Sequence, residues 1–270
     1  MEIWWTICCD VKKVEMKKDF GKIFGVILLS VIVVLTVYLS LFTYSQKGKE
    51  EIKMINIYGN NLLSKEIYMR FADMDQSSLY DDLNLNIIKK RIEEHPYVAK
   101  AEVKSDGRGN VDVRIKEKDI YAVLLSRTEP YFLTNDFELL KIHEFTTYSD
   151  IPVISNFRLS EKLVPAKVYK SEDIVDAFRI IDAAKITDIE LSKKLSEINL
   201  KSGGDVVLTF SGVNYPVVFG RGNESKKMIY LSLVWERINN LKASFQNTEY
   251  IDLRFTNEAY IGSKENTGLI

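Results

Sequence analysis

The side chains that most often perform catalysis are scarce in this 270-residue chain. It has two histidines, His95 and His143, and neither belongs to the His-Glu-x-x-His pattern of a zinc site. The two cysteines, Cys8 and Cys9, precede a long apolar run, so no thiol nucleophile follows that run. The chain also has no Gly-x-Ser-x-Gly motif for an activated serine. The sequence therefore predicts a protein that is not an enzyme and that needs no cofactor or metal.

Three groups of residues with chemical potential have structural explanations that are favoured. His95 stands before Pro96 at a predicted helix end, where it would cap the helix or complement its dipole. Gly220-Arg221-Gly222 lacks both the ending of a P-loop and the third glycine of a dinucleotide fingerprint, so it predicts a turn into a helix. Asp81 and Asp82 are adjacent and would not face one another on a helix, so they are interpreted as first-turn charges.

Partner binding is the function that remains, and the final predicted strand, residues 250–255, is the best candidate for it. Its period-two alternation predicts an apolar face and a polar face. The apolar face holds Ile251, Leu253 and Phe255, and the polar face holds Tyr250, Asp252 and Arg254. A terminal strand at a sheet edge exposes backbone groups that can pair with another chain. An amphipathic strand that only packs into the core is the alternative.

On the binding hypothesis, aromatic side chains anchor the partner, and Arg254 pairs with a carboxylate of that partner. The prediction also includes residues of the segment that follows the strand. The candidate partner-binding residues are Tyr250, Asp252, Arg254, Phe255, Thr256, Asn257 and Tyr260.

An apolar run decides where these residues work. It begins at Ile23, ends at Tyr44 and contains no charged residue. As a helix it would be about 33 Å long, enough to cross a hydrocarbon core of about 30 Å. The run is longer than the core of a cleaved signal peptide and ends without a small-residue cleavage site, so an uncleaved anchor is favoured. Five lysines precede it and three follow it among glutamates, which predicts residues 1–22 on the cytoplasmic side.

Beyond the apolar run, the composition is that of a folded, globular protein. Charged residues make up 28% and aromatic residues 11%, a mixture that can bury a core. The net charge of −1 argues against a nucleic-acid partner. Because both cysteines precede the anchor, the exported part must fold without a disulfide. An incidental cysteine pair is favoured over lipid attachment at Cys8 or Cys9.

The predicted fold class is α+β, with two domains after a linker at residues 45–51. Residues 52–118 predict the order strand, helix, helix, strand, strand. Here Ser64 caps the first helix, Asp81 and Asp82 open the second, and a hairpin loop joins the last two strands. Residues 119–262 predict a mainly antiparallel β domain with flanking helices. Residues 263–270 are predicted to be a flexible tail.

The second domain is predicted from several apolar patterns. Pro152 suggests that the strand around residues 151–154 lies near a sheet edge. Helical spacing appears at residues 171–184, with Ser171 as the cap, and again from Met228 to Ile238. The remaining predicted strands are residues 131–133, 139–140, 198–200, 206–210, 215–219, 250–255 and a weaker one at 259–261.

A series of short motifs spans the first domain. They are Ile55, Ile57, Gly59 and Asn60; Leu63, Ser64 and Ile67; Ser78-Leu79-Tyr80; and Pro96, Tyr97, Val98, Ala101 and Val103. Together they resemble a POTRA domain, in particular that of FtsQ/DivIB cell-division proteins. The single copy and its position directly after one anchor helix fit the same family.

The second half resembles FtsQ/DivIB more specifically. Phe219-Gly220 matches a turn into a helix, Lys227 matches a lysine early in that helix, and residues 250–255 match a Tyr-Ile-Asp-Leu-Arg-aromatic strand. One departure lies at Thr134-Asn135-Asp136-Phe137, where the family has an Asp-x-x-Gly turn.

This resemblance implies a non-enzymatic scaffold of the bacterial division complex. It would span the inner membrane once at the septum, with its folded domains outside the cytoplasm, and link early and late division proteins. The family's C-terminal region implies binding of FtsB and FtsL by strand addition, and the POTRA domain implies contacts with other division proteins. The alternative is a membrane-anchored POTRA factor that binds client polypeptides in envelope protein assembly or transport.

Overall fold

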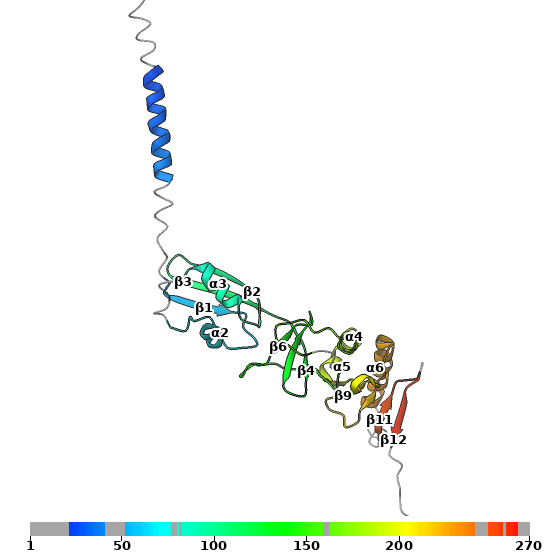
Figure 1. Ribbon diagram of the computed structural model, residues 1–270. Coiled ribbons are helices and arrows are strands. Elements are labelled where there is room, and N and C mark those ends of the chain that lie inside the picture. The colour runs from blue at the N-terminus through cyan, green and yellow to red at the C-terminus, as the bar shows by residue number, and fades with distance from the viewer. Residues whose placement is uncertain are drawn as a thin grey trace, which may run out of the picture.

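The computed structural model describes residues 22–40, 52–76, 80, 83–158, 162–240, 248–255 and 258–263. Figure 1 shows an N-terminal helix followed by two groups of strands, each with helices beside it. The first group is a three-stranded sheet and the second is a nine-stranded sheet. The α+β class predicted from the sequence is confirmed.

The N-terminal helix, Lys22–Ser40, is long and apolar enough to cross a membrane. Two of its hydroxyl side chains bond to carbonyls of the same helix, since Ser30 Oγ donates to the Ile27 carbonyl and Thr36 Oγ1 donates to the Val33 carbonyl, both at 2.8 Å. The predicted span begins at Ile23, inside this helix. Its last four residues, including Tyr44, lie outside the described part of the chain.

The three-stranded sheet has the order β1-β3-β2. Strand β1 (Met54–Tyr58) is parallel to β3 (Asn110–Glu117), and β2 (Val98–Ser105) is antiparallel to β3. Helices α2 (Lys65–Phe71) and α3 (Leu85–Glu93) contribute buried side chains to the same core as the strands. This is the predicted strand, helix, helix, strand, strand order.

The predicted start of the second helix in this unit is wrong. Helix α3 begins at Leu85, and its cap is Asn84, whose Oδ1 accepts a hydrogen bond from the Ile87 N–H at 2.9 Å. Asp81 and Asp82 lie outside the described residues. An asparagine cap two residues further along was missed because two adjacent acidic residues gave the more obvious signal of a helix start.

The nine-stranded sheet has the order β12-β11-β10-β9-β8-β7-β4-β5-β6. Five of its eight neighbouring pairs are antiparallel, as predicted for this half. The strands are β4 (Ile120–Leu125), β5 (Pro130–Thr134), β6 (Leu139–Lys141), β7 (Val153–Ser155), β8 (Leu195–Asn199), β9 (Val207–Phe210), β10 (Val217–Val218), β11 (Thr248–Asp252) and β12 (Tyr260–Ser263).

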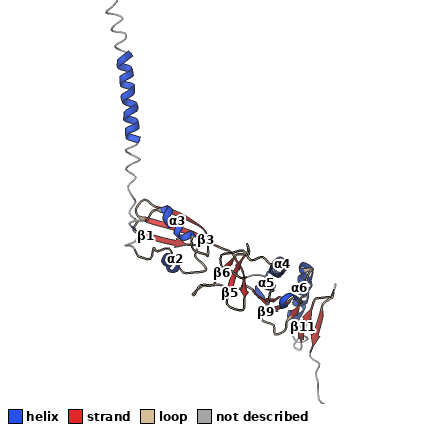
Figure 2. Cartoon of the chain, viewed as in Figure 1, coloured by secondary structure: helices blue, strands red, loops and turns tan. Residues whose placement is uncertain are grey.

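Among the described residues, three α-helices and one short 3₁₀ turn, η2 (Lys201–Gly203), accompany this sheet. Helix α4 (Glu172–Thr187) begins after Ser171, whose Oγ accepts from the Ile174 N–H, so the predicted cap is correct. It packs against α6 (Glu224–Asn240), and α5 (Ile189–Lys194) leads into β8. Figure 2 shows α4 and α6 beside one another next to the strands. Apolar residues from both helices, including Ile181 and Leu231, are buried against the sheet.

The prediction that Pro152 places its strand at a sheet edge is wrong. Strand β7 lies between β4 and β8, in the interior of the sheet. Pro152 stands just before the strand, and its carbonyl accepts from the Val123 N–H at 2.9 Å. Because Pro152 precedes the first residue of β7 and joins the pairing only through its carbonyl, its missing N–H is tolerated at this interior strand.

The two sheets are joined by buried contacts. Val123, Phe132 and Leu140 of the second sheet pack into the same apolar cluster as the core of the first. The Tyr97 hydroxyl donates to the Lys141 carbonyl at 3.0 Å and accepts from the His143 N–H at 2.9 Å. These contacts make the junction a packed interface, and the boundary between residues 118 and 119 stays a prediction.

Candidate functional site

Strand β12 forms one end of the nine-stranded sheet. It pairs with β11 in antiparallel register, with Tyr250 opposite Gly262, Ile251 opposite Ile261 and Asp252 opposite Tyr260. In the part of the chain that the structure describes, no segment pairs with the other edge of β12. That edge therefore presents backbone donors and acceptors that an added strand could use.

The opposite end of the sheet is closed by the chain itself. The Leu139 N–H on β6 donates to the Lys167 carbonyl at 3.0 Å, and the Leu139 carbonyl accepts from the Ala166 N–H at 2.7 Å. Glu138 forms a further bridge with Val168. The two ends of the sheet thus differ, since β6 is covered and β12 is open among the described residues.

Aromatic side chains surround the open edge. Tyr250 is 41% exposed, Tyr260 is 49% exposed and Phe255 is 51% exposed. The rings of Phe255 and Tyr260 meet edge to face with their centroids 4.7 Å apart. Ile261 adds an apolar side chain, 39% exposed, on β12 itself. Half-exposed aromatic side chains beside an open strand are suited to anchor a second polypeptide.

Arg254 pairs with two carboxylates of its own chain in this region. Asp252 is only 4% exposed, and it accepts hydrogen bonds from Arg254 Nε at 3.0 Å and from Arg254 Nη2 at 2.6 Å. Arg254 also donates to Asp205 at 2.9 Å. The hydrogen bonds from Arg254 hold the pKa of Asp252 below its ordinary value. Arg254 is therefore engaged within this chain, which differs from the expected pairing with a partner carboxylate.

Behind this ion pair lies a buried lysine. Lys227 Nζ donates to the carbonyls of Phe219 at 2.9 Å and Arg221 at 3.1 Å. Burial lowers its pKa, while the carboxylates of Glu224, Asp205 and Asp252 act in the opposite direction. The three motifs that carried the resemblance in the second half (Phe219-Gly220, Lys227 and the last strand) therefore meet at one place.

The structure changes the predicted faces of the last strand. Strand β11 ends at Asp252, so the alternation does not extend to Phe255, which is exposed instead of lying in the core. Asp252 is buried although it was placed on the polar face, because Arg254 pairs with it. Thr256 and Asn257 lie outside the described residues. The prediction that this strand lies at the sheet edge is also wrong, because β11 pairs with β10 on one side and with β12 on the other. Tyr250 on β11 and Tyr260 on β12 are exposed, and their role in binding stays a prediction.

Ile261 was not among the predicted site residues. The pattern predicts a weak strand at residues 259–261 but does not mark its isoleucine as part of a binding edge. An isoleucine on a short terminal strand with no predicted neighbour on one side was the available signal.

His95 is a packed, neutral histidine. Its ring lies among those of Tyr68, Phe71 and Tyr97, and its Nδ1 accepts from the Tyr97 N–H at 3.1 Å. Burial lowers its pKa to about 4, with smaller effects from the charges of His143 and Lys118. The predicted dipole-complementing role is wrong, since it needs a positive charge, whereas the hydrogen bond to Tyr97 does stabilise the turn after α3.

The other chemical candidates are also structural. Arg221 binds Asp176 at 2.7 Å and Asp173 at 3.0 Å, which fastens the turn before α6 to α4. Gly220 and Gly222 have φ of +67° and +74°, as the predicted turn requires. Within the described residues, no group of three or more His, Cys, Asp or Glu side chains could hold a metal ion.

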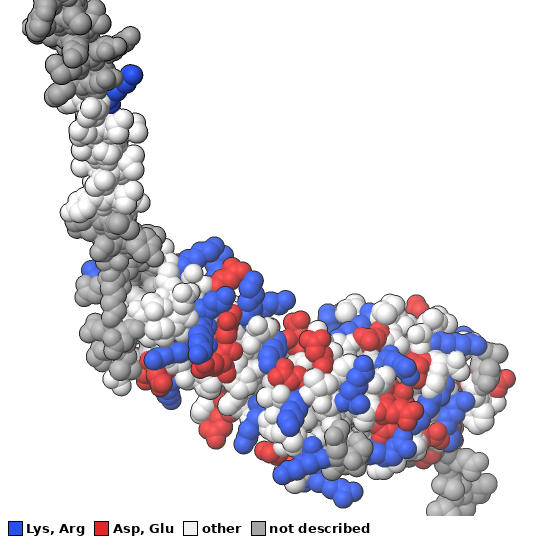
Figure 3. All heavy atoms as spheres, turned by 45° about the horizontal axis from the view of Figure 1, so that its top comes forward, with Lys and Arg blue, Asp and Glu red and all other residues white. Residues whose placement is uncertain are grey.

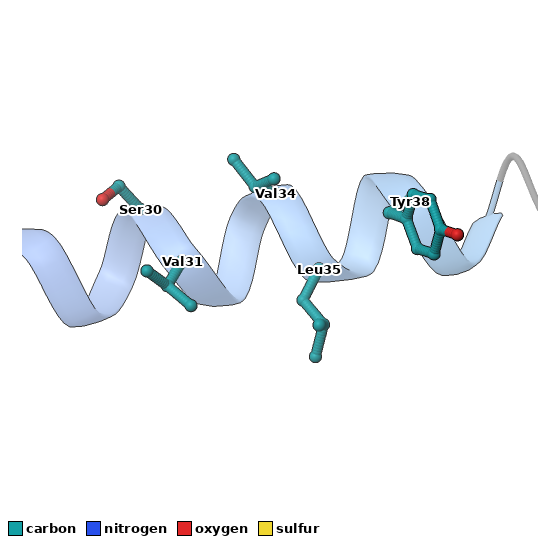
Figure 4. Close-up of a pocket in the computed structure, with 5 residues that line it drawn as sticks. All are labelled: Ser30, Val31, Val34, Leu35 and Tyr38. Atoms are coloured by element: carbon teal, nitrogen blue, oxygen red, sulfur yellow. The ribbon is translucent and has the colours of Figure 1, made fainter.

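Two of the surface hollows are lined, as far as the structure describes the chain, by residues other than histidine and cysteine. One lies on the apolar helix, where Figure 4 shows the side chains that line it, from Ser30 to Tyr38. The other is a groove of about 620 Å³ beside the junction, lined by residues that include Gly59, Glu117 and Tyr148. The face in Figure 3 shows Lys and Arg side chains interspersed with Asp and Glu, unlike the one-sided basic surface typical of nucleic-acid binding.

In a comparison with known proteins, each of the two folded units matches a protein family. Residues 51–118 match the family described as POTRA domain, FtsQ-type, and residues 122–254 match the family described as cell division protein FtsQ/DivIB, C-terminal. The cell division protein FtsQ of Syntrophotalea carbinolica is 22% identical over 206 residues, which cover 76% of this chain and 71% of the relative.

Proposed function

Because the chain belongs to the FtsQ/DivIB family of cell-division proteins, we propose that it is a non-enzymatic membrane scaffold that binds other division proteins by strand addition at β12. The observation that carries this proposal is the contrast between the two ends of the nine-stranded sheet. The β6 end is covered by residues 166–168, whereas the β12 end has an open edge among the described residues. Its partners are proteins like FtsB and FtsL.

In strand addition, main-chain hydrogen bonds supply affinity and the side chains next to the strand select the partner. At this site Tyr260, Phe255 and Ile261 are the selecting side chains, since each is exposed near the edge. Arg254 contributes by holding the end of β11 through Asp252.

The membrane helix holds these domains at the inner membrane, with the N-terminus in the cytoplasm and the folded units outside it at the septum. The helix Lys22–Ser40 and the excess of lysines before it support this placement. The POTRA domain contacts further division proteins and, through its packed junction with the second sheet, orients the β12 edge.

The test uses the full-length protein in membranes. Successive N–H groups along an antiparallel strand point alternately to the neighbouring strand and away from it, so one of Tyr260 and Ile261 donates outward. We expect Tyr260→Pro and Ile261→Pro each to abolish co-purification of the FtsB-like and FtsL-like proteins. The proline that replaces the residue with the outward-pointing N–H should abolish co-purification while amide exchange in β11 stays slow. Unchanged co-purification with both variants would show that strand addition at β12 is wrong.

The alternative function is client binding in envelope assembly through the strand edges of the POTRA domain. Depletion of the protein separates the two functions. Filamentous cells with unfinished septa support the division function, whereas normal septation with missing outer-membrane proteins supports the alternative.

A further inference from the structure

Lys227 is a buried cation in an unfavourable position. It is only 9% exposed and lies one turn into α6, where the positive end of the helix dipole opposes a positive charge. Its compensation is specific, since Nζ donates to the carbonyls of Phe219 and Arg221. These two carbonyls stand on either side of Gly220. A single ammonium group therefore holds both sides of one tight turn.

The turn that Lys227 holds is pressed against Arg254. A Cβ atom at Gly220 would lie 2.9 Å from Arg254 Cγ and 3.4 Å from Lys227 Nζ. Gly220 thus lies between the Lys227 and Arg254 side chains, with no room there for a side chain of its own. Its φ of +67° is one that glycine adopts without strain. A displacement of this turn would be passed directly to the Arg254 side chain.

Arg254 in turn fixes the chain as it leaves β11. It binds Asp252, the last residue of the strand, and Asp205, which precedes β9. The Leu253 N–H donates to the Val218 carbonyl of β10 at 2.8 Å. Arg254 is followed by Phe255, whose ring contacts that of Tyr260 on β12. A continuous set of contacts therefore connects Lys227 to the open edge.

We propose that Lys227 is a positioning residue for partner binding at β12. By holding the turn at residues 219–221 it keeps Arg254 in place, and Arg254 directs the chain so that Phe255 packs on Tyr260 at the edge. Lys227 itself does not touch the added strand. The inference rests on the proposed function of this edge, and the partner concerned is a second polypeptide in extended conformation.

The experiment uses the full-length protein in detergent micelles, with the FtsB-like protein of the same organism as the probe. Lys227→Met keeps the aliphatic length and removes the donors. We expect this variant to weaken binding by about tenfold or more, with faster amide exchange confined to the turn at residues 219–221 and the segment from Asp252 to Gly262. Lys226→Met, the exposed neighbour on the same helix, is the matched control and should bind as the natural protein does. Lys227→Arg restores a cationic donor and should recover part of the affinity.

A double-mutant cycle tests the route through the turn. Gly220→Ala displaces Arg254 directly, so it should weaken binding to a similar degree. The variant that combines Gly220→Ala with Lys227→Met should bind no more weakly than the weaker-binding single variant, because both changes act on one contact. Losses that add in full would overturn the proposed route.

The inference is overturned if Lys227→Met binds the partner normally, or if its loss of binding comes with faster exchange throughout α4 and β4. The second result would mean that the lysine only stabilises the fold. These failures are distinct from failure of the proposed function. If prolines at Tyr260 and Ile261 abolish binding but Lys227→Met does not, the edge is the binding site and only the positioning role is wrong.

Discussion

The ring of Tyr250 on β11 lies across Gly262, the residue opposite it on β12. A Cβ atom at Gly262 would be only 2.3 Å from Tyr250 Cε1 and 2.6 Å from Cζ. The tyrosine therefore covers the site where a side chain is missing, and this contact stabilises a strand that has a described neighbour on one side only.

Gly262→Ala should loosen β12. The added methyl group must displace the Tyr250 ring, and overpacking of this kind costs about 1–3 kcal/mol. We expect a lower free energy of unfolding in urea and faster amide exchange in β12. Tyr250→Ala removes the ring that the added methyl group would displace. The double variant Tyr250→Ala with Gly262→Ala should therefore be no less stable than Tyr250→Ala alone. A Gly262→Ala protein with normal exchange in β12 would contradict the contact.

Much of the fold could be predicted wherever one face of an element meets water. The strands β3 and β9 and the helix α4 show their buried positions as clean periodic patterns. Strand β4 was missed because Ala122, Val123 and Leu124 are all buried, and a strand covered on both faces has no alternation.

The turn at residues 134–137 shows why a motif departure need not change the fold. Phe137 stands where the family has glycine, yet it adopts a φ of +64°. Its ring stacks on Phe178 with a centroid distance of 4.3 Å, and Thr134 Oγ1 accepts from the Glu138 N–H at 3.0 Å. Tertiary packing compensates for the strained backbone, and such packing cannot be predicted from local spacing.

The candidate site was predicted less well than the fold. The sequence pattern predicts its exposed tyrosines, but it places the open edge at residues 250–255, whereas the edge strand is β12. The burial of Asp252 and the exposure of Phe255 do not follow from the pattern, because they depend on an ion pair that ends the strand at Asp252. The hydrogen bonds from Lys227 to the carbonyls of the turn before α6 could not be predicted either, because they depend on how the turn and the helix lie relative to each other in space.

Phe255→Ala should weaken partner binding by about 2 kcal/mol, as expected for a central aromatic anchor. The matched control is Phe145→Ala, because Phe145 is an even more exposed phenylalanine, at 84%, in the loop after β6 at the other end of the sheet. Co-purification with the FtsB-like protein measures both. Equal effects of the two substitutions would argue against a specific role for the aromatic surface at β12.

Asp252→Asn should remove an acid-sensitive part of the stability. The pKa of Asp252 is lowered in the folded protein, chiefly by hydrogen bonds from Arg254. Its stabilisation is therefore fully present above the unfolded pKa of about 4 and is lost as the pH falls through the lower folded value. We expect the natural protein to be more stable than Asp252→Asn at pH 7, and the difference in their free energies of unfolding to shrink below about pH 4. Urea unfolding of both proteins across this range measures it, and a constant difference would contradict the ion pair.

Tyr97→Phe tests the junction between the two sheets. The substitution removes one hydroxyl and leaves the Lys141 carbonyl and the His143 N–H without that partner, at a cost of about 1–3 kcal/mol. Tyr215→Phe is the matched control, because the Tyr215 hydroxyl is buried and has no hydrogen-bond partner among the residues that the structure describes. Its removal should be neutral or stabilising. Thermal unfolding of the two variants compares them, and equal losses would mean that the hydroxyl of Tyr97 does not hold the junction.

His95 predicts a second pH dependence with its own window. Burial lowers the pKa of His95 to about 4, whereas an unfolded chain has a histidine pKa of about 6.5. Between these values the unfolded state binds more protons than the folded state, so stability must fall as the pH falls from about 6.5 to about 4. His95→Gln stays neutral in both states and lacks this loss. We therefore expect the stability of the variant to rise relative to the natural protein as the solution is acidified from pH 7 to pH 4.5. Urea unfolding at intervals of half a pH unit measures how the free energy of unfolding of each protein changes with pH. Equal changes in the two proteins would show that the imidazole is not held neutral within the aromatic cluster.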